Sequence, residues 1–326
     1  MRILALQLKR IGDLVLTTPA LRALRDAHPT AEIALAVTPG CAPLLGAIDS
    51  ISSGIVLGRG RGFAPWQQVL TGPWDLCIDF TGSDRSALAV AASRARERAT
   101  FALVKRSKMR ALAYNRFASS SVRERHTVDH YLDLVGADAP IAPSLRLPKT
   151  AHAAADELLR AASIASPFVL VHPGSARAEK YWLAERWAGV IASLKTPCIV
   201  TSGPDAFERE HVAVIKSEIR NQKSEILFPP DLLTLAALIE RASLVLSCDT
   251  AAVHFAAAFA RPQIALFGPT NPFHWRPRHD RALVLSAAKP ASPLRDFRPR
   301  MKGAPMDRIS TDIVIGAIAS LIPKTN

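Results

Sequence analysis

The chain has 326 residues, 49% of them hydrophobic, and 41 Lys and Arg against 28 Asp and Glu give a formal net charge of +13. This length allows two core-forming domains of roughly 150 residues each. No uncharged apolar run approaches the roughly 20 residues needed to span a bilayer, which argues against a transmembrane protein. The excess positive charge indicates an anionic partner: nucleic acid, a membrane surface, or a phosphorylated or carboxylated substrate.

Elements of the first half alternate between short apolar runs and amphipathic stretches. We expect strands near Ile3, Ile33, Ile55, Leu76 and Phe101, and helices over residues 17–27, 84–94 and 128–135. The first strand and first helix are joined by a tight turn at residues 9–13, which has one glycine followed by the acid Asp13. Phosphate-binding turns at this place usually offer several glycines, so the carboxylate points to another task.

The second half repeats the pattern after a Pro- and Ala-containing stretch, residues 138–155, which predicts a linker. We therefore expect domains at residues 1–150 and 151–326, with the last helix a candidate to pack back on the first domain. Five strands follow in PFVLVHPG, TPCIVTSG, SEILF, ASLVLSCD and PQIALFG. Near-continuous apolar strands alternating with helices predict two doubly wound α/β domains with parallel sheets facing one another.

The four cysteines are far apart, and Cys77, Cys198 and Cys248 lie inside apolar runs. This is typical of reduced core cysteines in a cytosolic chain. No Cys or His grouping has zinc-ligand spacing, and Lys9 and Arg10 interrupt the N-terminal apolar run, so neither a zinc site nor a signal peptide is expected. The sequence thus predicts a protein that is soluble or at most peripheral.

Ligands of doubly wound sheets bind beyond the carboxyl ends of the strands, and several of those ends carry unusual residues. The first is the turn with Asp13. Residues 172–175 end a buried strand with a glycine and a hydroxyl, and Lys180 follows before the next helix, an arrangement able to cradle a diphosphate. Asp249 and Thr250 open a later helix, where unpaired N–H groups favour an anion.

Each candidate also has a plainer explanation. Asp13 and Asp249 are favoured helix-capping residues, and Lys180 fits a solvated loop. In a further strand end, SGPDAFERE, Glu208 fits a surface acid early in a helix, and His254 fits a packing residue. Neither G-x-G-x-x-G nor G-x-x-x-x-G-K-[ST] occurs, which argues against nicotinamide cofactors and P-loop NTPase chemistry.

Four segments carry a resemblance: RIGDLVLTTPALRALR, WDLCIDFTGSDRSALAVAASR, VHPGSARAEKYWLAERWAGVI and DTAAVHFAAAFARPQIALFGPTNPFHW. Together they resemble the ADP-heptose:lipopolysaccharide heptosyltransferases, glycosyltransferase family 9, over nearly the whole chain. The resemblance implies a GT-B fold with an N-terminal acceptor domain, a C-terminal nucleotide-sugar domain, and inverting transfer without metal or cofactor. It implies ADP-heptose as donor, an acidic lipid-linked or core glycan as acceptor, and a cytoplasmic location, with peripheral attachment to the inner membrane left open.

The resemblance also implies roles for residues. Asp13 would be the general base and Lys180 would stabilise the leaving diphosphate. The implied donor-binding residues are Ser175, Glu208, Asp249, Thr250, Ala251 and His254. The last four match a D-T-G-x-x-H motif in which Ala251 replaces the usual glycine. The Cβ of this alanine raises the question of how closely the backbone can approach the phosphate. Glu208 would bind the ribose hydroxyls, with Asp205 as the alternative.

The implied acceptor-binding residues are Lys9, Arg10, Arg106, Lys108 and Arg110. The last three belong to the basic run VKRSKMRALAYNRFASSSVRER, which suits an acidic acceptor, although a solvated charge run is the alternative. Two other functions stay open: a GT-B enzyme using another nucleotide-sugar, either a glycosyltransferase or an epimerase, and a nucleic-acid-binding protein. With 6% aromatic residues and no RNA-binding or helix-turn-helix signature, no nucleic-acid partner is expected.

Overall fold

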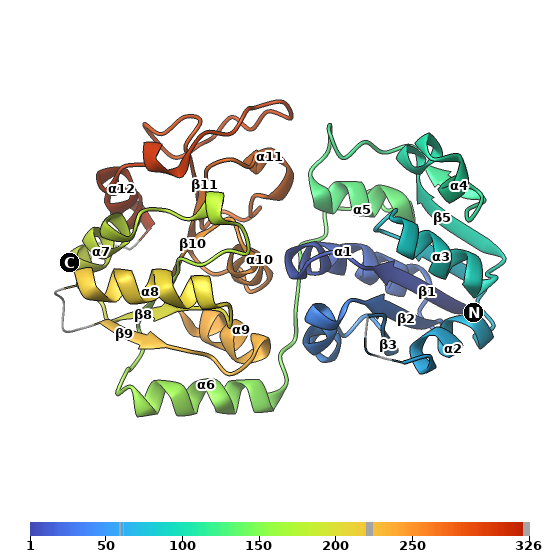
Figure 1. Cartoon of the computed structure of the whole chain (residues 1–326), viewed down its shortest axis with the longest axis horizontal. Helices are drawn as coiled ribbons and strands as arrows, with labels where there is room; N and C mark the ends of the chain where they lie inside the picture. Colours follow the sequence, from blue (N-terminus) through green and yellow to red (C-terminus); the bar gives the residue numbers. More distant parts are fainter. Residues whose placement is uncertain (59, 61, 220–223, 322–326) are drawn as a thin grey trace. The chain divides into compact units, whose positions relative to one another are not determined.

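The computed structural model describes residues 1–58, 60, 62–219 and 224–321 (Figure 1). The chain divides into two compact units, Met1–Arg146 and Leu147–Asn326. The boundary expected from the sequence was residue 150. Within the described part of the chain, no helix is both long enough and apolar enough to cross a membrane.

The N-terminal unit has, among its described residues, one parallel sheet of six strands in the order β3-β2-β1-β4-β5-β6. These strands are β1 (Arg2–Gln7), β2 (Glu32–Val37), β3 (Ser53–Val56), β4 (Leu76–Asp79), β5 (Glu97–Phe101) and β6 (Arg116–Ala118). The helices are α1 (Ile11–Ala27), α2 (Ala64–Thr71), α3 (Asp84–Ser93), α4 (Lys108–Ala111) and α5 (Thr127–Val135), with the 3-10 helices η1 (Pro39–Ala47) and η2 (Ala102–Arg106). Helix α1 packs against α5.

The C-terminal unit repeats this plan, with six described strands in the order β12-β11-β10-β7-β8-β9. They are β7 (Val169–His172), β8 (Cys198–Thr201), β9 (Ser224–Leu227), β10 (Leu244–Cys248), β11 (Gln263–Phe267) and β12 (Ala282–Ser286). The helices are α6 (Lys149–Ala161), α7 (Ala184–Ser193), α8 (Ala206–Glu218), α9 (Leu232–Arg241), α10 (Ala251–Ala258), α11 (Pro272–Trp275) and α12 (Thr311–Leu321), with η3 (Ala178–Lys180) and η4 (Met306–Arg308). The last helix, α12, packs against α7 of its own unit.

Each sheet has one place where the strand order reverses. Strand β1 pairs with both β2 and β4, and β7 pairs with both β8 and β10, in every case in parallel. Ligands of doubly wound sheets bind beyond the carboxyl ends of the strands at such a switch point. The carboxyl ends of β1 and β4, and of β7 and β10, are therefore the places to look for function, and the prediction of doubly wound parallel sheets is confirmed.

Helix α1 differs from the prediction because it begins at Ile11, so that Asp13 lies in its first helical turn rather than in a loop. Pro19 lies inside this helix, and its missing N–H leaves the Val15 carbonyl without its usual donor. The Thr18 hydroxyl donates to that carbonyl (2.7 Å), so the helix continues through the proline.

Two other local details differ from the prediction, although the boundary between the units does lie within residues 138–155. The expected linker at residues 138–155 is helical from Lys149, because the Ala-rich sequence after Pro148 favours α6. The edge strands β6 and β12 were not predicted, and β6 has only three residues, too few to show a period. The prediction of core cysteines is confirmed, since all four are buried and unpaired.

Candidate functional site

The switch point of the N-terminal unit carries Asp13. Its side chain is partly exposed, and Oδ1 accepts a hydrogen bond from the Tyr131 hydroxyl of α5 (3.1 Å). The Lys9 ammonium lies 3.4 Å from the same hydroxyl oxygen. Burial, and then the Asp13 carboxylate, raises the pKa of Tyr131 well above its ordinary value, so Tyr131 remains a donor. Asp13 does not cap α1, because the N-cap residue is Arg10, with no side-chain capping bond.

Two buried polar side chains tie the end of β1 to this helical turn. Gln7 is fully buried, and its Nε2 donates to Thr17 Oγ1 (2.7 Å). The Thr17 hydroxyl in turn donates to the backbone carbonyl of Asp13 (2.7 Å). The backbone that carries the Asp13 carboxylate is thus fixed relative to the sheet.

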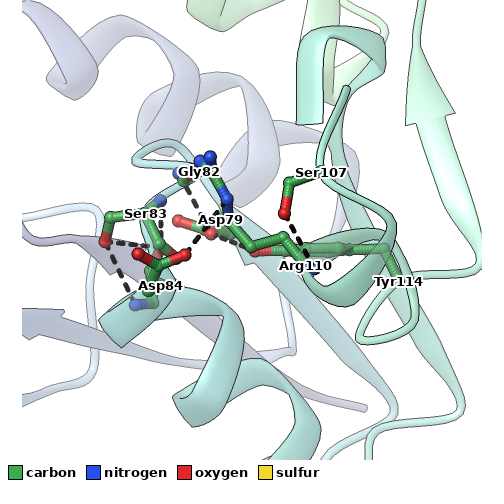
Figure 2. A network of polar contacts seen from close by, with 8 residues as sticks. Asp79, Gly82, Ser83, Asp84, Ser107, Arg110 and Tyr114 are labelled. Carbon is green, nitrogen blue, oxygen red and sulfur yellow. Dashed lines mark hydrogen bonds and ion pairs between the residues drawn. The ribbon is translucent and has the colours of Figure 1, made fainter. Parts of the chain in front are cut away.

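A second carboxylate, Asp79, ends β4 at the same switch point and is fully buried. Figure 2 shows it beside Gly82 and Tyr114: Oδ2 accepts from the Gly82 N–H (3.1 Å) and the Tyr114 hydroxyl (2.6 Å), while Oδ1 accepts from the Thr81 N–H (2.8 Å). Burial raises the pKa of Asp79, and these hydrogen bonds oppose the rise. Asp79 therefore closes the turn between β4 and α3, whereas the Asp13 carboxylate is partly exposed.

Arg110, on α4, contacts the turn between β4 and α3. Its Nη1 donates to the Gly82 carbonyl (2.8 Å), and its Nε lies 3.1 Å from Asp84 Oδ1 (Figure 2). This guanidinium, expected to bind an acceptor, is thus engaged within the protein. The neighbouring Arg106 and Lys108 side chains are exposed.

The switch point of the C-terminal unit carries a buried ion pair. Lys180 Nζ lies 2.6 Å from Asp249 Oδ2, and the two side chains are only 13% and 8% exposed. Thr270 Oγ1 donates to the same carboxylate oxygen (2.6 Å). Both plainer explanations are therefore wrong: Lys180 is not solvated, and Thr250 rather than Asp249 is the N-cap residue of α10.

A tryptophan anchor holds the segment that carries Lys180. Trp182 is fully buried, and its Nε1 donates to the Ile309 carbonyl (3.0 Å). Its ring packs edge-on against Trp187, with 5.0 Å between centroids. Because η3 ends just before this anchor, the lysine side chain extends from a fixed backbone toward the end of β10.

The side chain of Glu208, in the first turn of α8, packs against Gly174 and Gly203 and is only partly exposed to solvent. Its Oε2 accepts from the Gly203 N–H (2.7 Å), and a Cβ on Gly174 would lie 2.9 Å from the Glu208 carboxyl carbon. Burial raises the pKa of Glu208. Asp205 is the N-cap residue of α8, and its Oδ1 accepts from the Phe207 N–H (2.9 Å). Of the two acids, Glu208 is the one beside the loop that follows β7.

The remaining expected donor residues lie at the same edge of this sheet. Ser175 is buried in the loop after β7, and His254 is buried in α10. Thr250 makes no side-chain capping bond, and Ala251 begins the helix without a positive φ. The backbone at residue 251 therefore does not require the glycine that the resemblance would place there.

Among the residues of these networks that were not found from the sequence are Tyr131, Asp79 and Thr270. Tyr131 is one apolar position in a helical pattern, and nothing local indicates that its hydroxyl meets α1. Thr270 follows the buried strand run PQIALFG, so its place at a strand carboxyl end was a usable signal.

Solved structures share this fold. The chain superposes with a TM-score of 0.82 on a glycosyltransferase family 9 protein from Veillonella parvula DSM 2008, at 23% identity over 98% of this chain and 96% of that one. Escherichia coli ADP-heptose lps heptosyltransferase II gives a TM-score of 0.81 at 20% identity, covering 98% of both chains. The predicted GT-B fold is confirmed.

Sequence comparisons agree with these structures. Lipopolysaccharide heptosyltransferase 3 of Escherichia coli strain K12 is 25% identical over an alignment of 339 positions that covers 96% of each protein. Another Escherichia coli lipopolysaccharide heptosyltransferase 3 is 29% identical over 173 residues. This match covers 50% of this chain and 49% of that protein. The family model of glycosyltransferase family 9 (heptosyltransferase) matches residues 63–304. The chain therefore belongs to glycosyltransferase family 9, the heptosyltransferase family, and is a glycosyl-transferring enzyme.

Proposed function

We propose that this enzyme transfers a heptose from ADP-heptose to an acidic acceptor of the lipopolysaccharide core, with inversion and without a metal ion. One observation carries the proposal: the two switch points hold complementary groups, an accessible carboxylate at Asp13 and a buried cation at Lys180. Solved relatives support the donor, since Escherichia coli heptosyltransferase WaaC is known with ADP and with ADP-2-deoxy-2-fluoro heptose. The lipopolysaccharide heptosyltransferases among the relatives support the acceptor class.

Asp13 acts as the general base in this proposal. The acceptor oxygen forms a bond to the anomeric carbon of the heptose while the bond from that carbon to the diphosphate oxygen breaks, and the hydroxyl proton passes to Asp13. Tyr131 donates to Oδ1 and so orients the carboxylate, which leaves Oδ2 to meet the hydroxyl.

Lys180 stabilises the departing diphosphate. Its ammonium, the Ser175 hydroxyl and the amino end of α10 at Thr250 lie at the same edge of the sheet and supply fixed positive charge and donors. Asp249 holds the ammonium in place before the donor arrives, so Asp249 is a positioning residue. Ala251 and His254 line the same end of α10.

Glu208 binds the ribose hydroxyls of the nucleotide. One carboxylate oxygen is committed to the Gly203 N–H, and the other, Oε1, has no hydrogen bond within the residues that the structure describes. Asp205 is committed to capping α8, which favours Glu208 for this role.

The N-terminal unit, which binds the acceptor in this proposal, also has a surface suited to peripheral attachment to an anionic membrane. Large apolar side chains are exposed on η2, α4 and the residue after it: Leu103 (50%), Met109 (81%) and Leu112 (79%). They alternate with the cations Arg106 and Lys108, a combination that suits the boundary between lipid headgroups and acyl chains. Replacing Met109 and Leu112 by serine should lower sedimentation with anionic vesicles, whereas Val214→Ser, an exposed change on α8, should not.

A donor and acceptor panel tests the proposed function. Purified enzyme is incubated with ADP-heptose, UDP-glucose, UDP-N-acetylglucosamine or GDP-mannose, with and without a heptose-deficient lipopolysaccharide acceptor, and the products are read by mass. We expect acceptor-dependent transfer from ADP-heptose. Transfer only from another nucleotide-sugar, or an epimerised sugar nucleotide formed without acceptor, would reject it.

A further inference from the structure

The ion pair of Lys180 and Asp249 has a third member. Thr270, in the loop after β11, donates from Oγ1 to Asp249 Oδ2 (2.6 Å), the oxygen that Lys180 Nζ also contacts at 2.6 Å. The last torsion of an aspartate side chain is broad, so a carboxylate held by one partner turns easily. Here two donors, one from η3 and one from the loop after β11, fix its direction.

The fixed carboxylate directs the ammonium group. An ammonium has three N–H groups. Lys180 Nζ donates to Asp249 Oδ2 and, at 3.3 Å, to the backbone carbonyl of the same residue. No other described residue accepts a hydrogen bond from it. One N–H group is therefore left for a ligand beyond the carboxyl ends of β7 and β10.

Thr270 also affects how strongly Asp249 competes with such a ligand. An anionic ligand and the Asp249 carboxylate both attract the ammonium, and the Asp249 side chain is only 8% exposed. A buried carboxylate that loses its only partner is strongly destabilised. The Thr270 hydroxyl stays on the carboxylate when the ammonium turns toward a ligand, so the free-energy cost of that turn is smaller.

Asn271 fixes the loop that carries Thr270. Its Nδ2 donates to the backbone carbonyls of Arg298 (2.9 Å) and Pro299 (3.0 Å). Its Oδ1 accepts from the Phe273 N–H (2.9 Å) and caps α11. The backbone beside Thr270 is therefore tied both to α11 and to residues 298–299.

Close backbone contacts extend this support to residue 304. The Ala304 N–H donates to the Gly268 carbonyl (3.0 Å). A Cβ at Gly303 would overlap the Pro269 carbonyl oxygen, so only a residue without a side chain allows this approach. Residues 298–304, which we call the support segment, thus hold the loop after β11 at residues 268, 269 and 271.

We propose that Thr270 is a positioning residue for nucleotide binding. It holds the Asp249 carboxylate so that the Lys180 ammonium presents one N–H group to the diphosphate of a nucleoside diphosphate. The support segment keeps Thr270 in place and so influences diphosphate affinity from outside the ion pair. The inference rests on the proposed function for the statement that the ligand of Lys180 is the diphosphate of the donor.

Calorimetry with ADP and with adenosine tests the role of the hydroxyl. Thr270→Val keeps the shape of the side chain and should raise the Kd of ADP about tenfold, because the carboxylate loses one charged hydrogen bond. The Kd of adenosine, which lacks phosphate, should stay unchanged. Thr270→Ser keeps the hydroxyl and should bind ADP nearly as the natural sequence does. Thr234→Val is the matched control: it removes a buried hydroxyl that has no partner among the described residues and should leave both Kd values unchanged.

A double-mutant cycle shows whether Thr270 acts through Lys180. In the Lys180→Met background, Thr270→Val should no longer change the Kd of ADP, because the group that it positions is absent. A residue that only stabilises the fold would weaken binding equally in both backgrounds. Where Lys180→Met itself weakens ADP binding, three results would overturn the inference: equal losses in both backgrounds, an unchanged Kd for Thr270→Val, or failure of Thr270→Ser to retain binding.

The support segment is tested at Gly303. Gly303→Ala should raise the Kd of ADP severalfold, since its Cβ displaces the loop that carries Thr270. Gly316→Ala adds the same methyl group on α12, where the new Cβ has no neighbour within 4 Å among the described atoms outside its own helix, and should leave the Kd unchanged. Equal Kd values for the two variants would reject the role of the segment.

A measurement without nucleotide separates this inference from the proposed function. In the full chain labelled with ¹⁵N-lysine, the Lys180 ammonium hydrogens should exchange slowly with water at pH 7, since the ion pair is buried. Thr270→Val should speed this exchange, and Thr234→Val should not. If the exchange responds in this way but Lys180→Met leaves the Kd of ADP unchanged, the proposed role of Lys180 is rejected, and the hold of Thr270 on the ion pair stands. If Lys180→Met weakens ADP binding while Thr270→Val changes neither the exchange nor the Kd, the positioning role is rejected, and the proposed function stands.

Discussion

The two units share a strand order but place different chemistry at their switch points. In the N-terminal unit the carboxylate of Asp13 accepts a hydrogen bond from a neutral hydroxyl, that of Tyr131, and stays partly exposed. In the C-terminal unit the carboxylate of Asp249 is buried and forms an ion pair with the Lys180 ammonium. The common topology decides where each site lies, and the partner of each carboxylate decides what that site can do.

The largest effect on turnover is expected when the partly exposed carboxylate of the N-terminal unit, Asp13, is removed. Asp13→Asn keeps the size of the side chain but cannot take the proton of an attacking hydroxyl, so kcat should fall about 100- to 10,000-fold. ADP affinity should stay nearly unchanged, because Lys180 and Glu208 belong to the other unit. Near-normal turnover of the variant would reject Asp13 as the base.

Removing the cation should act on nucleotide binding. Lys180→Met should weaken ADP binding about 10- to 100-fold, since it removes a buried charged partner and leaves the Asp249 carboxylate unpaired. Adenosine, which lacks phosphate, should lose much less affinity by calorimetry. The variant Lys180→Met with Asp249→Asn removes both charges and should restore thermal stability more than ADP affinity. Equal losses for ADP and adenosine would show that Lys180 does not contact phosphate.

Acid should weaken both units, because each buries a neutral histidine. Burial lowers the pKa of His130 and of His172 to about 4. In the unfolded chain each titrates near 6.5, so between about pH 6.5 and pH 4 the unfolded state binds protons that the folded state excludes, and stability falls as pH falls. The loss should reach up to about 3 kcal/mol per histidine. Urea unfolding at pH 7, 6 and 5 measures it, and His172→Gln should flatten the slope. A pH-independent midpoint would contradict the prediction.

The smallest effect is expected from chelation. No Asp-x-Asp motif occurs in the sequence, and Lys180 with the amino end of α10 supplies positive charge for the diphosphate. The rate with the correct donor and acceptor should therefore stay nearly unchanged in excess EDTA, and added Mg²⁺ should change it only modestly. A rate that collapses in EDTA and returns with stoichiometric metal would refute the role given to Lys180.

Local patterns were enough to predict the sheets and the strand ends that matter. Buried parallel strands have near-continuous apolar runs, so β1, β4, β7 and β10 were visible, and the residues just after them were candidates by position. Side-chain partners were not predictable in the same way. Tyr131 is 118 positions from Asp13, and Lys180 is 69 positions from Asp249, so both pairs depend on which elements become neighbours.

The start of α1 shows a second limit of sequence reasoning. Gly12 near its beginning favours a turn on propensity alone, and the prediction accordingly began the helix at residue 17. Pro19 lies in the middle of the helix, where the Thr18 hydroxyl donates to the carbonyl that the proline leaves open, and a hydrophobic pattern does not contain this compensation between side chain and backbone. Asp13 consequently occupies a rigid helical turn.

The buried cysteines have a practical consequence. Cys41 and Cys77 lie in the N-terminal unit, and Cys198 and Cys248 in the C-terminal unit. Burial raises the pKa of all four thiols, so the folded chain presents little thiolate to an alkylating reagent. Each thiol reacts when its own unit opens. Mass-resolved labelling of the natural sequence therefore compares the opening rates of the two units in one sample, without any introduced probe.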